Sequence, residues 1–118
     1  MRRKSSLYIK DIIDAITKIE EFTKGITYEE IINDDKTSSA VIRKIEIIGE
    51  AVKQLPEDIR NRFSEIPWSP IAKMRDKVIH FYHGVDHEVI WKVVKDDLPS
   101  LKQKLQGIYA ILKKEEER

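Results

Sequence analysis

The stretch of the chain best suited to chemistry lies between positions 75 and 82, where an arginine, a histidine and a tyrosine follow one another closely. Arg75 and His80 are five residues apart, and Tyr82 follows two residues later. Histidine transfers protons near neutral pH, while arginine keeps its charge and binds phosphate oxygens through paired N–H groups. This combination suits cleavage of a phosphodiester, in which protons move between oxygens and negative charge builds up at phosphorus.

RNA cleavage without a metal needs a base for the ribose 2′-hydroxyl and an acid for the leaving oxygen. A single histidine does not easily serve as both, so we expect a two-fold homodimer, whose interface would bring two copies of Arg75 and His80 to one cleft. On a regular helix Asp76 lies one turn before His80, where its carboxylate would orient the imidazole and favour its protonated form. On that helix Arg75 and Tyr82 share one edge of the apolar stripe, and His80 points away from the core.

Simpler interpretations of these residues remain open. An exposed Asp–His pair on a helix is usually only solvated. Arg75 can equally form a structural ion pair with Glu46, Glu50 or Asp76. The sequence by itself does not choose between these roles and catalysis.

The remaining histidines and the tryptophans suggest structural roles. His83 and His87 flank Gly84 and Asp86 and indicate a turn and the start of a helix. Asp86, His87 and Glu88 share one turn without a second ligand cluster, so we expect no metal site and no cofactor. Trp68 and Trp91 are more typical of core or interface anchors than of platforms for base stacking. The sequence contains no Gly-rich phosphate loop and no Ser/His/Asp arrangement.

Length and composition narrow the class of protein. The 118 residues are enough for one domain, and there is no cysteine. A balance of 22 basic and 21 acidic residues gives a net charge of +1, so the chain lacks the large basic excess of a general nucleic-acid binder. No apolar run approaches the roughly 18 residues needed to span a bilayer, and charges interrupt the segment after the basic N-terminus. We therefore expect a cytoplasmic protein without membrane contact.

Apolar residues recur at helical spacing throughout, which predicts an all-α antiparallel helix bundle of about five main helices plus short helical pieces. The chain is expected to form a single domain over residues 1–118, with its core at about 7–112. Main helices are predicted at about 7–24, at 41–55, from the Ser69-Pro70 start signal to Gly84, after Asp86, and from about Pro99. A capping box at Thr27 opens a short turn, residues 33–39 form a polar connection whose last residues cap the next helix, and residues 113–118 fray. The predicted core includes Ile12, Ile16, Ile45, Val52, Val78, Val93 and Leu105.

Gly49 lies near the apolar stripe of the second predicted main helix, four residues after Ile45. A glycine inside a helix costs about 1 kcal/mol relative to alanine. Close approach of another helix is one explanation for its presence there.

The ordered motifs resemble one known family. Arg75 to Tyr82 matches the Arg-x4-His-x-Tyr signature of the HepT-type toxins of the HEPN superfamily. Further similar segments occur in the same order and cover about residues 7–112: Glu46 to Ala51 with its Ile-Gly-Glu-Ala run, Ile66 to Trp68, Gly84 to Asp86, Val89 to Trp91, and Leu98 to Leu101. The chain departs from the family at Asp76, where Asn is frequent, and at Lys73, where Gly is frequent.

The resemblance implies a function. It implies a metal-independent endoribonuclease that acts on RNA in a cleft between two protomers, with Arg75 and His80 as the catalytic residues. It implies the toxin of a type VII-like toxin–antitoxin system, whose partner is a minimal nucleotidyltransferase antitoxin that adenylylates Tyr82. The alternative is a non-catalytic HEPN subunit that binds nucleotides or contacts other subunits in a nucleotidyltransferase complex. Both need the same fold and partner, so the sequence does not separate them.

Overall fold

The computed structural model describes residues 3–80 and 84–118, except for the side chain of residue 80, and helices dominate it. Three helices are long, and short helical segments and a pair of two-residue strands connect them. The elements in chain order are α1 (Ser5–Thr23), α2 (Tyr28–Ile32), α3 (Asp35–Gln54), α4 (Glu57–Arg62), α5 (Trp68–Ala72), α6 (Met74–Val78), β1 (Ile79–His80), β2 (Gly84–Val85), α7 (His87–Lys92), the π-helical segment η1 (Val93–Asp97) and α8 (Leu98–Glu116). The predicted all-α class is confirmed.

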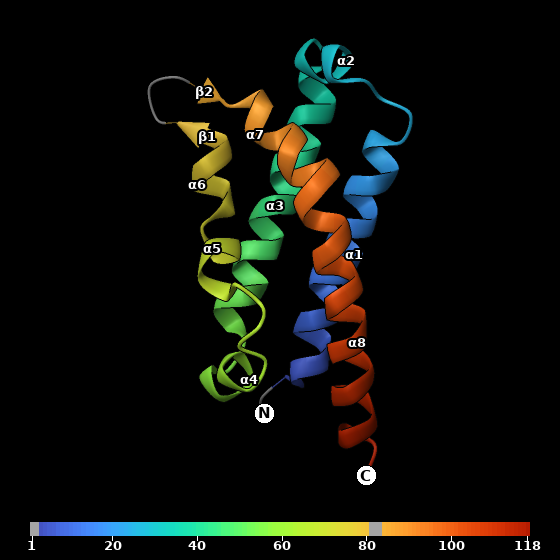
Figure 1. Cartoon of the computed structure of the whole chain (residues 1–118), viewed down its shortest axis with the longest axis vertical. Helices are drawn as coiled ribbons and strands as arrows, with labels where there is room; N and C mark the ends of the chain where they lie inside the picture. The colour runs from blue at the N-terminus through green and yellow to red at the C-terminus, as the bar shows by residue number, and fades with distance from the viewer. Residues whose placement is uncertain (1–2, 81–83) are drawn as a thin grey trace.

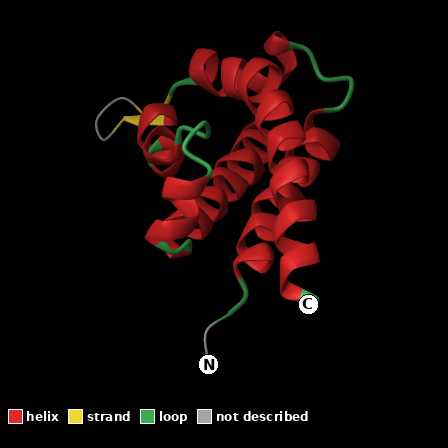
Figure 2. Cartoon of the chain, turned by 60° about the horizontal axis from the view of Figure 1, so that its bottom comes forward, coloured by secondary structure: helices red, strands yellow, loops and turns green. Residues whose placement is uncertain are grey.

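Helix α1 runs antiparallel to both α3 and α8, so the predicted antiparallel arrangement holds for these pairs (Figure 1). The chain rises along α1, returns along α3, rises again through α5 and α6, and descends along α7, η1 and α8, so that both termini lie at one end (Figure 1). The two strands lie at the edge of the molecule, away from the long helices, in both views (Figures 1 and 2). The short helices α5 and α6 pack against α3 at the side of the bundle, and α6 contains Arg75.

The core forms where the apolar stripes of α1, α3 and α8 meet. All seven residues predicted for it are buried, with at most 3% of the surface of any of them exposed, and further isoleucines and leucines surround them. Burial of such side chains stabilises the fold by about 1.5–3 kcal/mol each. The predicted core residues are thereby confirmed: Ile12, Ile16, Ile45, Val52, Val78, Val93 and Leu105.

Side-chain caps define several helix starts. The predicted capping box at Thr27 is present: its hydroxyl accepts the Glu30 N–H, and the Glu30 carboxylate accepts the Thr27 N–H. The predicted polar connection at residues 33–39 is mostly helical instead, because Asp34 rather than a later residue caps α3. The Asp34 carboxylate accepts hydrogen bonds from the backbone and hydroxyl of Thr37, which hold the pKa of Asp34 below its usual range.

The last quarter of the chain forms one continuous helical rod, α7–η1–α8. Asp86 caps α7 as predicted, by accepting the N–H of Val89. Pro99 falls in the first turn of α8, also as predicted, and it has no N–H to donate to the carbonyl of Lys95. The turn before it widens, and Leu98 N–H donates to the carbonyl of Val93 five residues earlier. The proline thus changes the helical pitch without ending the rod.

The predicted helix from Ser69 to Gly84 is wrong in its second half. Helix α5 begins at Trp68, the backbone breaks at Lys73, and α6 ends at Val78. In a longer helix the carbonyl of Val78 would accept the N–H of residue 82, but here it accepts the N–H of Asp86 at 2.7 Å. Tertiary pairing of this kind overrides the apolar spacing that suggested a helix.

Candidate functional site

The position of Arg75 is set by a close contact between α3 and the end of α5. A Cβ atom at Gly49 would lie 2.9 Å from the carbonyl oxygen of Ala72, closer than real Cβ atoms come to such a group. The proposed explanation for this glycine, close approach of another helix, is therefore confirmed. Lys73 has a φ of −100°, which any residue adopts, so lysine fits the break between α5 and α6 without strain.

Arg75 lies on α6 between two carboxylates. Its Nε is 3.9 Å from Oε2 of Glu46 on α3, and its Nη1 is 3.8 Å from Oδ1 of Asp76. The Arg75 side chain is 47% exposed and makes no hydrogen bond within the described part of the chain. Of the three acidic partners considered from the sequence, the structure selects Glu46 and Asp76, whereas Glu50 pairs with Lys53. The guanidinium is oriented by charge and still accessible to a phosphate.

The backbone of His80 belongs to a strand rather than a helix. Ile79 pairs with Val85 and His80 pairs with Gly84, whose φ of +74° is a conformation that favours glycine. The predicted helical geometry at His80 is therefore wrong: Asp76 is not one helical turn beneath His80. The side chain of His80 and residues 81–83, with Tyr82 and His83, lie outside the described residues.

The other residues considered from the sequence take structural positions. His87 is the first residue of α7, as predicted. Trp68 is buried and its indole N–H donates to the carbonyls of Arg60 and Phe63, which confirms a core role. Trp91 packs edge-on against the ring of Tyr28, with the ammonium group of Lys95 above its own ring. No group of three or more potential metal ligands occurs among the described residues.

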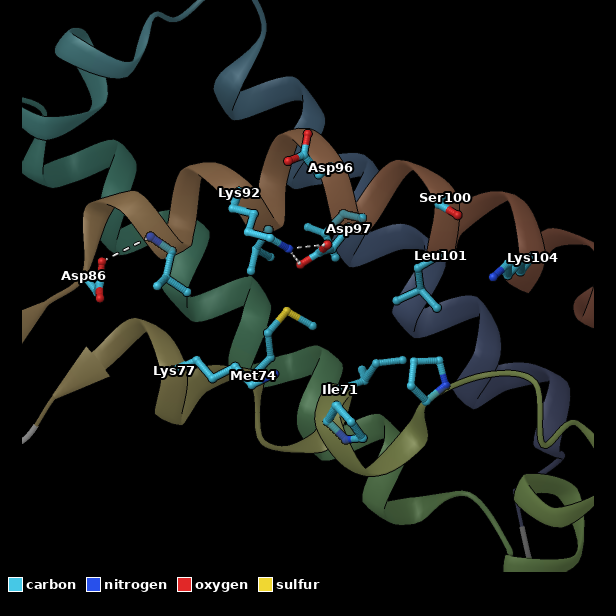
Figure 3. Close-up of a pocket in the computed structure, with 15 residues that line it drawn as sticks. Ile71, Met74, Lys77, Asp86, Lys92, Asp96, Asp97, Ser100, Leu101 and Lys104 are labelled. Atoms are coloured by element: carbon cyan, nitrogen blue, oxygen red, sulfur yellow. Dashed lines mark hydrogen bonds and ion pairs between the residues drawn. The ribbon is translucent and has the colours of Figure 1, made fainter.

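An open groove, which the sequence did not predict, runs along the opposite side of α6 from Glu46. Its volume is about 750 Å³, and it separates α5 and α6 from the rod α7–η1–α8 (Figure 3). Met74, Ile71 and Leu101 give it apolar walls, and an ion pair between Lys92 and Asp97 lies along the rod side. Helix α6 therefore presents Arg75 towards α3, and Met74 and Lys77 towards the groove.

None of the helices described over residues 3–80 and 84–118 is long and apolar enough to cross a membrane.

Comparison with known proteins identifies relatives over nearly the whole chain. The family model described as "Ribonuclease HepT-like" matches residues 12–108. A protein of Thermococcus cleftensis named "Probable ribonuclease HepT" is 53% identical over 108 residues, which cover 92% of this chain and 98% of that protein. A protein of Methanocaldococcus jannaschii named as a candidate RNase is 40% identical over 110 residues. The match covers 93% of this chain and 91% of that protein.

One relative is a larger protein. In Methanocaldococcus jannaschii, a protein named as a gamma-glutamylcyclotransferase and candidate RNase is 43% identical over 114 residues. The match covers 97% of this chain but only 51% of that protein, so the same unit occurs there beside another domain. No solved structure matches the chain significantly.

Proposed function

The chain belongs to the HepT-like ribonuclease family, and from this we propose that it is a metal-independent endoribonuclease with Arg75 and His80 as its catalytic pair. The observation that carries the proposal is that the Arg75 guanidinium is exposed and accessible to a phosphate. Arg75 lies on the helix that leads directly into the strand containing His80, and its guanidinium makes no hydrogen bond within the described part of the chain. Such a group can form two charge-assisted hydrogen bonds to a phosphate.

The proposed reaction is a transesterification at phosphorus. The imidazole of His80 takes the proton of the ribose 2′-hydroxyl, and the 2′-oxygen forms a bond to phosphorus. The bond from phosphorus to the 5′-oxygen breaks, and that oxygen gains a proton from a protonated imidazole. The products are a 2′,3′-cyclic phosphate and a 5′-hydroxyl. Arg75 stabilises the negative charge that builds up on the phosphorane oxygens.

The two proton transfers call for two histidines, so the proposal includes a two-fold homodimer. An isologous interface that brings the signature segments together supplies a basic imidazole from one protomer and an acidic one from the other. The strand pair lies at the edge of the molecule, away from the long helices, where it is accessible to a second protomer (Figure 1).

The proposed biological role is that of a cytoplasmic toxin in a type VII-like toxin–antitoxin system. A minimal nucleotidyltransferase antitoxin would silence it by adenylylating Tyr82. The sequence signature supports this role, because Tyr82 stands two residues after His80, at the position of the family's modified tyrosine.

The test is RNA cleavage in excess EDTA by the wild type, Arg75→Ala and His80→Ala. Each substitution is expected to lower the rate by about 10²–10⁴-fold, the usual contribution of positioned acid–base and charge-stabilising groups. Equal cleavage by all three proteins would mean that the activity belongs to another site. RNA binding without cleavage by the wild type would instead favour the non-catalytic subunit of a nucleotidyltransferase complex.

A further inference from the structure

Glu46 is the residue of the bundle that reaches Arg75 from another element. Its Oε2 lies 3.9 Å from Nε of Arg75, and its side chain is 40% exposed. We infer that Glu46 is a positioning residue, whose carboxylate beside Nε orients the Arg75 guanidinium and partly balances its charge while an RNA phosphate binds the exposed side of that guanidinium. The inference rests on the proposed function and adds a residue outside the signature to the site.

The two helices pack closely, and buried residues anchor both of them near the ion pair. Gly49, one turn after Glu46 on α3, lets the carbonyl of Ala72 approach closely, and Arg75 follows Ala72 by three residues. Ile45 and Ile48 near Glu46 are fully buried, and Met74 and Val78 anchor α6 in the core. This packing sets where the backbones of α3 and α6 meet. Glu46 and Arg75 therefore face each other as a consequence of the fold.

The ion pair between Glu46 and Arg75 is weak enough that a phosphate can compete with it for Arg75. It is exposed, longer than a hydrogen bond, and of a kind that contributes about 0–1 kcal/mol to stability. Asp76 adds a second carboxylate 3.8 Å from Nη1. Two negative charges therefore flank one positive charge, and a phosphate that binds Arg75 must compete with them.

Loss of the Glu46 charge should act in opposite directions on binding and turnover. Without the competing carboxylate, the phosphate meets less repulsion and RNA binds more tightly. Without its partner on α3, the guanidinium samples more orientations and stabilises the transition state less, since small errors of placement reduce rates strongly. A side chain with only a structural role would not produce this split.

The first experiment compares steady-state RNA cleavage by the wild type, Glu46→Gln and Glu50→Gln. Glu50 is the matched control, because it lies one turn further along α3, is exposed and pairs with Lys53. Glu46→Gln should lower kcat by about tenfold or more and lower KM by about two- to fivefold, with an unchanged melting temperature. Glu50→Gln should match the wild type. Unchanged kcat in Glu46→Gln, or a higher KM, would overturn the inference.

The second experiment measures binding alone, so that it also decides the matter if the protein does not cleave RNA. The probe is a 2′-O-methyl RNA oligonucleotide, which has no 2′-hydroxyl proton and cannot undergo the proposed reaction. Glu46→Gln should bind it about two- to fivefold more tightly than the wild type, and this gain should vanish in the Arg75→Ala background. A gain that persists without Arg75 would show that Glu46 acts on RNA independently of Arg75, and no gain at all would show that it does not compete with phosphate. Either result would overturn the inference.

Discussion

The carboxylate of Glu116, at the end of α8, caps the start of α1 by accepting hydrogen bonds from the backbone N–H and the hydroxyl of Ser6. The backbone bond is 3.2 Å long, and Ser6 is almost fully buried. The first N–H groups of a helix have no partner within it, and α1 has no side-chain cap at Lys4. The last helix therefore supplies the cap that the first helix lacks.

Replacement of Glu116 by alanine should lower the free energy of unfolding by about 0.5–2 kcal/mol, the usual cost of losing a helix cap. Urea denaturation followed by circular dichroism measures this. Glu117→Ala is the control, because Glu117 is exposed and its side chain forms no hydrogen bond or ion pair within the described part of the chain. Equal stability of the two variants would show that the cap does not contribute.

Replacement of Gly49 by alanine should destabilise the protein, although alanine is the better helix former. The new Cβ would force the Ala72 carbonyl away, and overpacking typically costs about 1–3 kcal/mol, more than the gain of about 1 kcal/mol in helix propensity. Gly107 is the matched control. It lies inside α8, and a Cβ atom added there would meet no described atom within 4 Å, so Gly107→Ala should stabilise by about 0.5–1 kcal/mol. Opposite shifts in the two urea midpoints are expected, and shifts of the same sign would contradict the close-contact explanation.

The sequence predicted those parts of the fold that depend on local patterns. Stripes of isoleucine, leucine and valine identified the long helices and all seven core residues, and short polar signals located the caps at Thr27 and Asp86. These features follow from helical periodicity and from the side chains of neighbouring residues, which a sequence displays directly.

The errors occurred where distant residues decide the local structure. The apolar spacing of Met74, Val78 and residue 81 suggested one long helix, but the hydrogen bond between Val78 and Asp86 ends it. The expected fraying of residues 113–118 is also wrong, because Glu115 pairs with Arg62 and Glu116 caps α1. Three acidic partners for Arg75 were equally compatible with the sequence. The contact between α3 and α6 is what makes Glu46, rather than Glu50, the partner of Arg75 on α3.

The homodimer can be tested by measuring mass in solution. Sedimentation equilibrium at micromolar concentration should give twice the mass of the 13.9 kDa chain. A disulfide formed between two copies of a Lys77→Cys variant, at an exposed position three residues before His80, would place these segments of two protomers side by side, since the natural chain has no cysteine. A monomer, or a dimer in which no such disulfide forms, would count against a shared cleft.

Control through Tyr82 gives the last prediction. An adenylyl group on its hydroxyl would add a phosphodiester and a purine. Along the chain, these groups would lie two residues after His80 and two residues before Gly84. The negative charge of the phosphate would repel incoming RNA and compete for Arg75, and the added bulk would block the cleft. This silencing does not require a helix that joins Arg75 and Tyr82, because Tyr82 is only two residues from His80 along the chain.

A cognate nucleotidyltransferase, supplied with ATP and magnesium, should therefore raise the mass by one AMP unit per modified tyrosine and abolish RNA cleavage. Mass spectrometry and the cleavage assay measure the two effects on the same sample. Tyr82→Phe removes only the hydroxyl that accepts the adenylyl group, so it should retain cleavage and escape silencing. Tyr109→Phe, on α8, is the control and should still be modified and silenced. If the nucleotidyltransferase with ATP fully inactivated Tyr82→Phe, either another residue would be modified or binding alone would suffice, and the proposed switch at Tyr82 would be wrong.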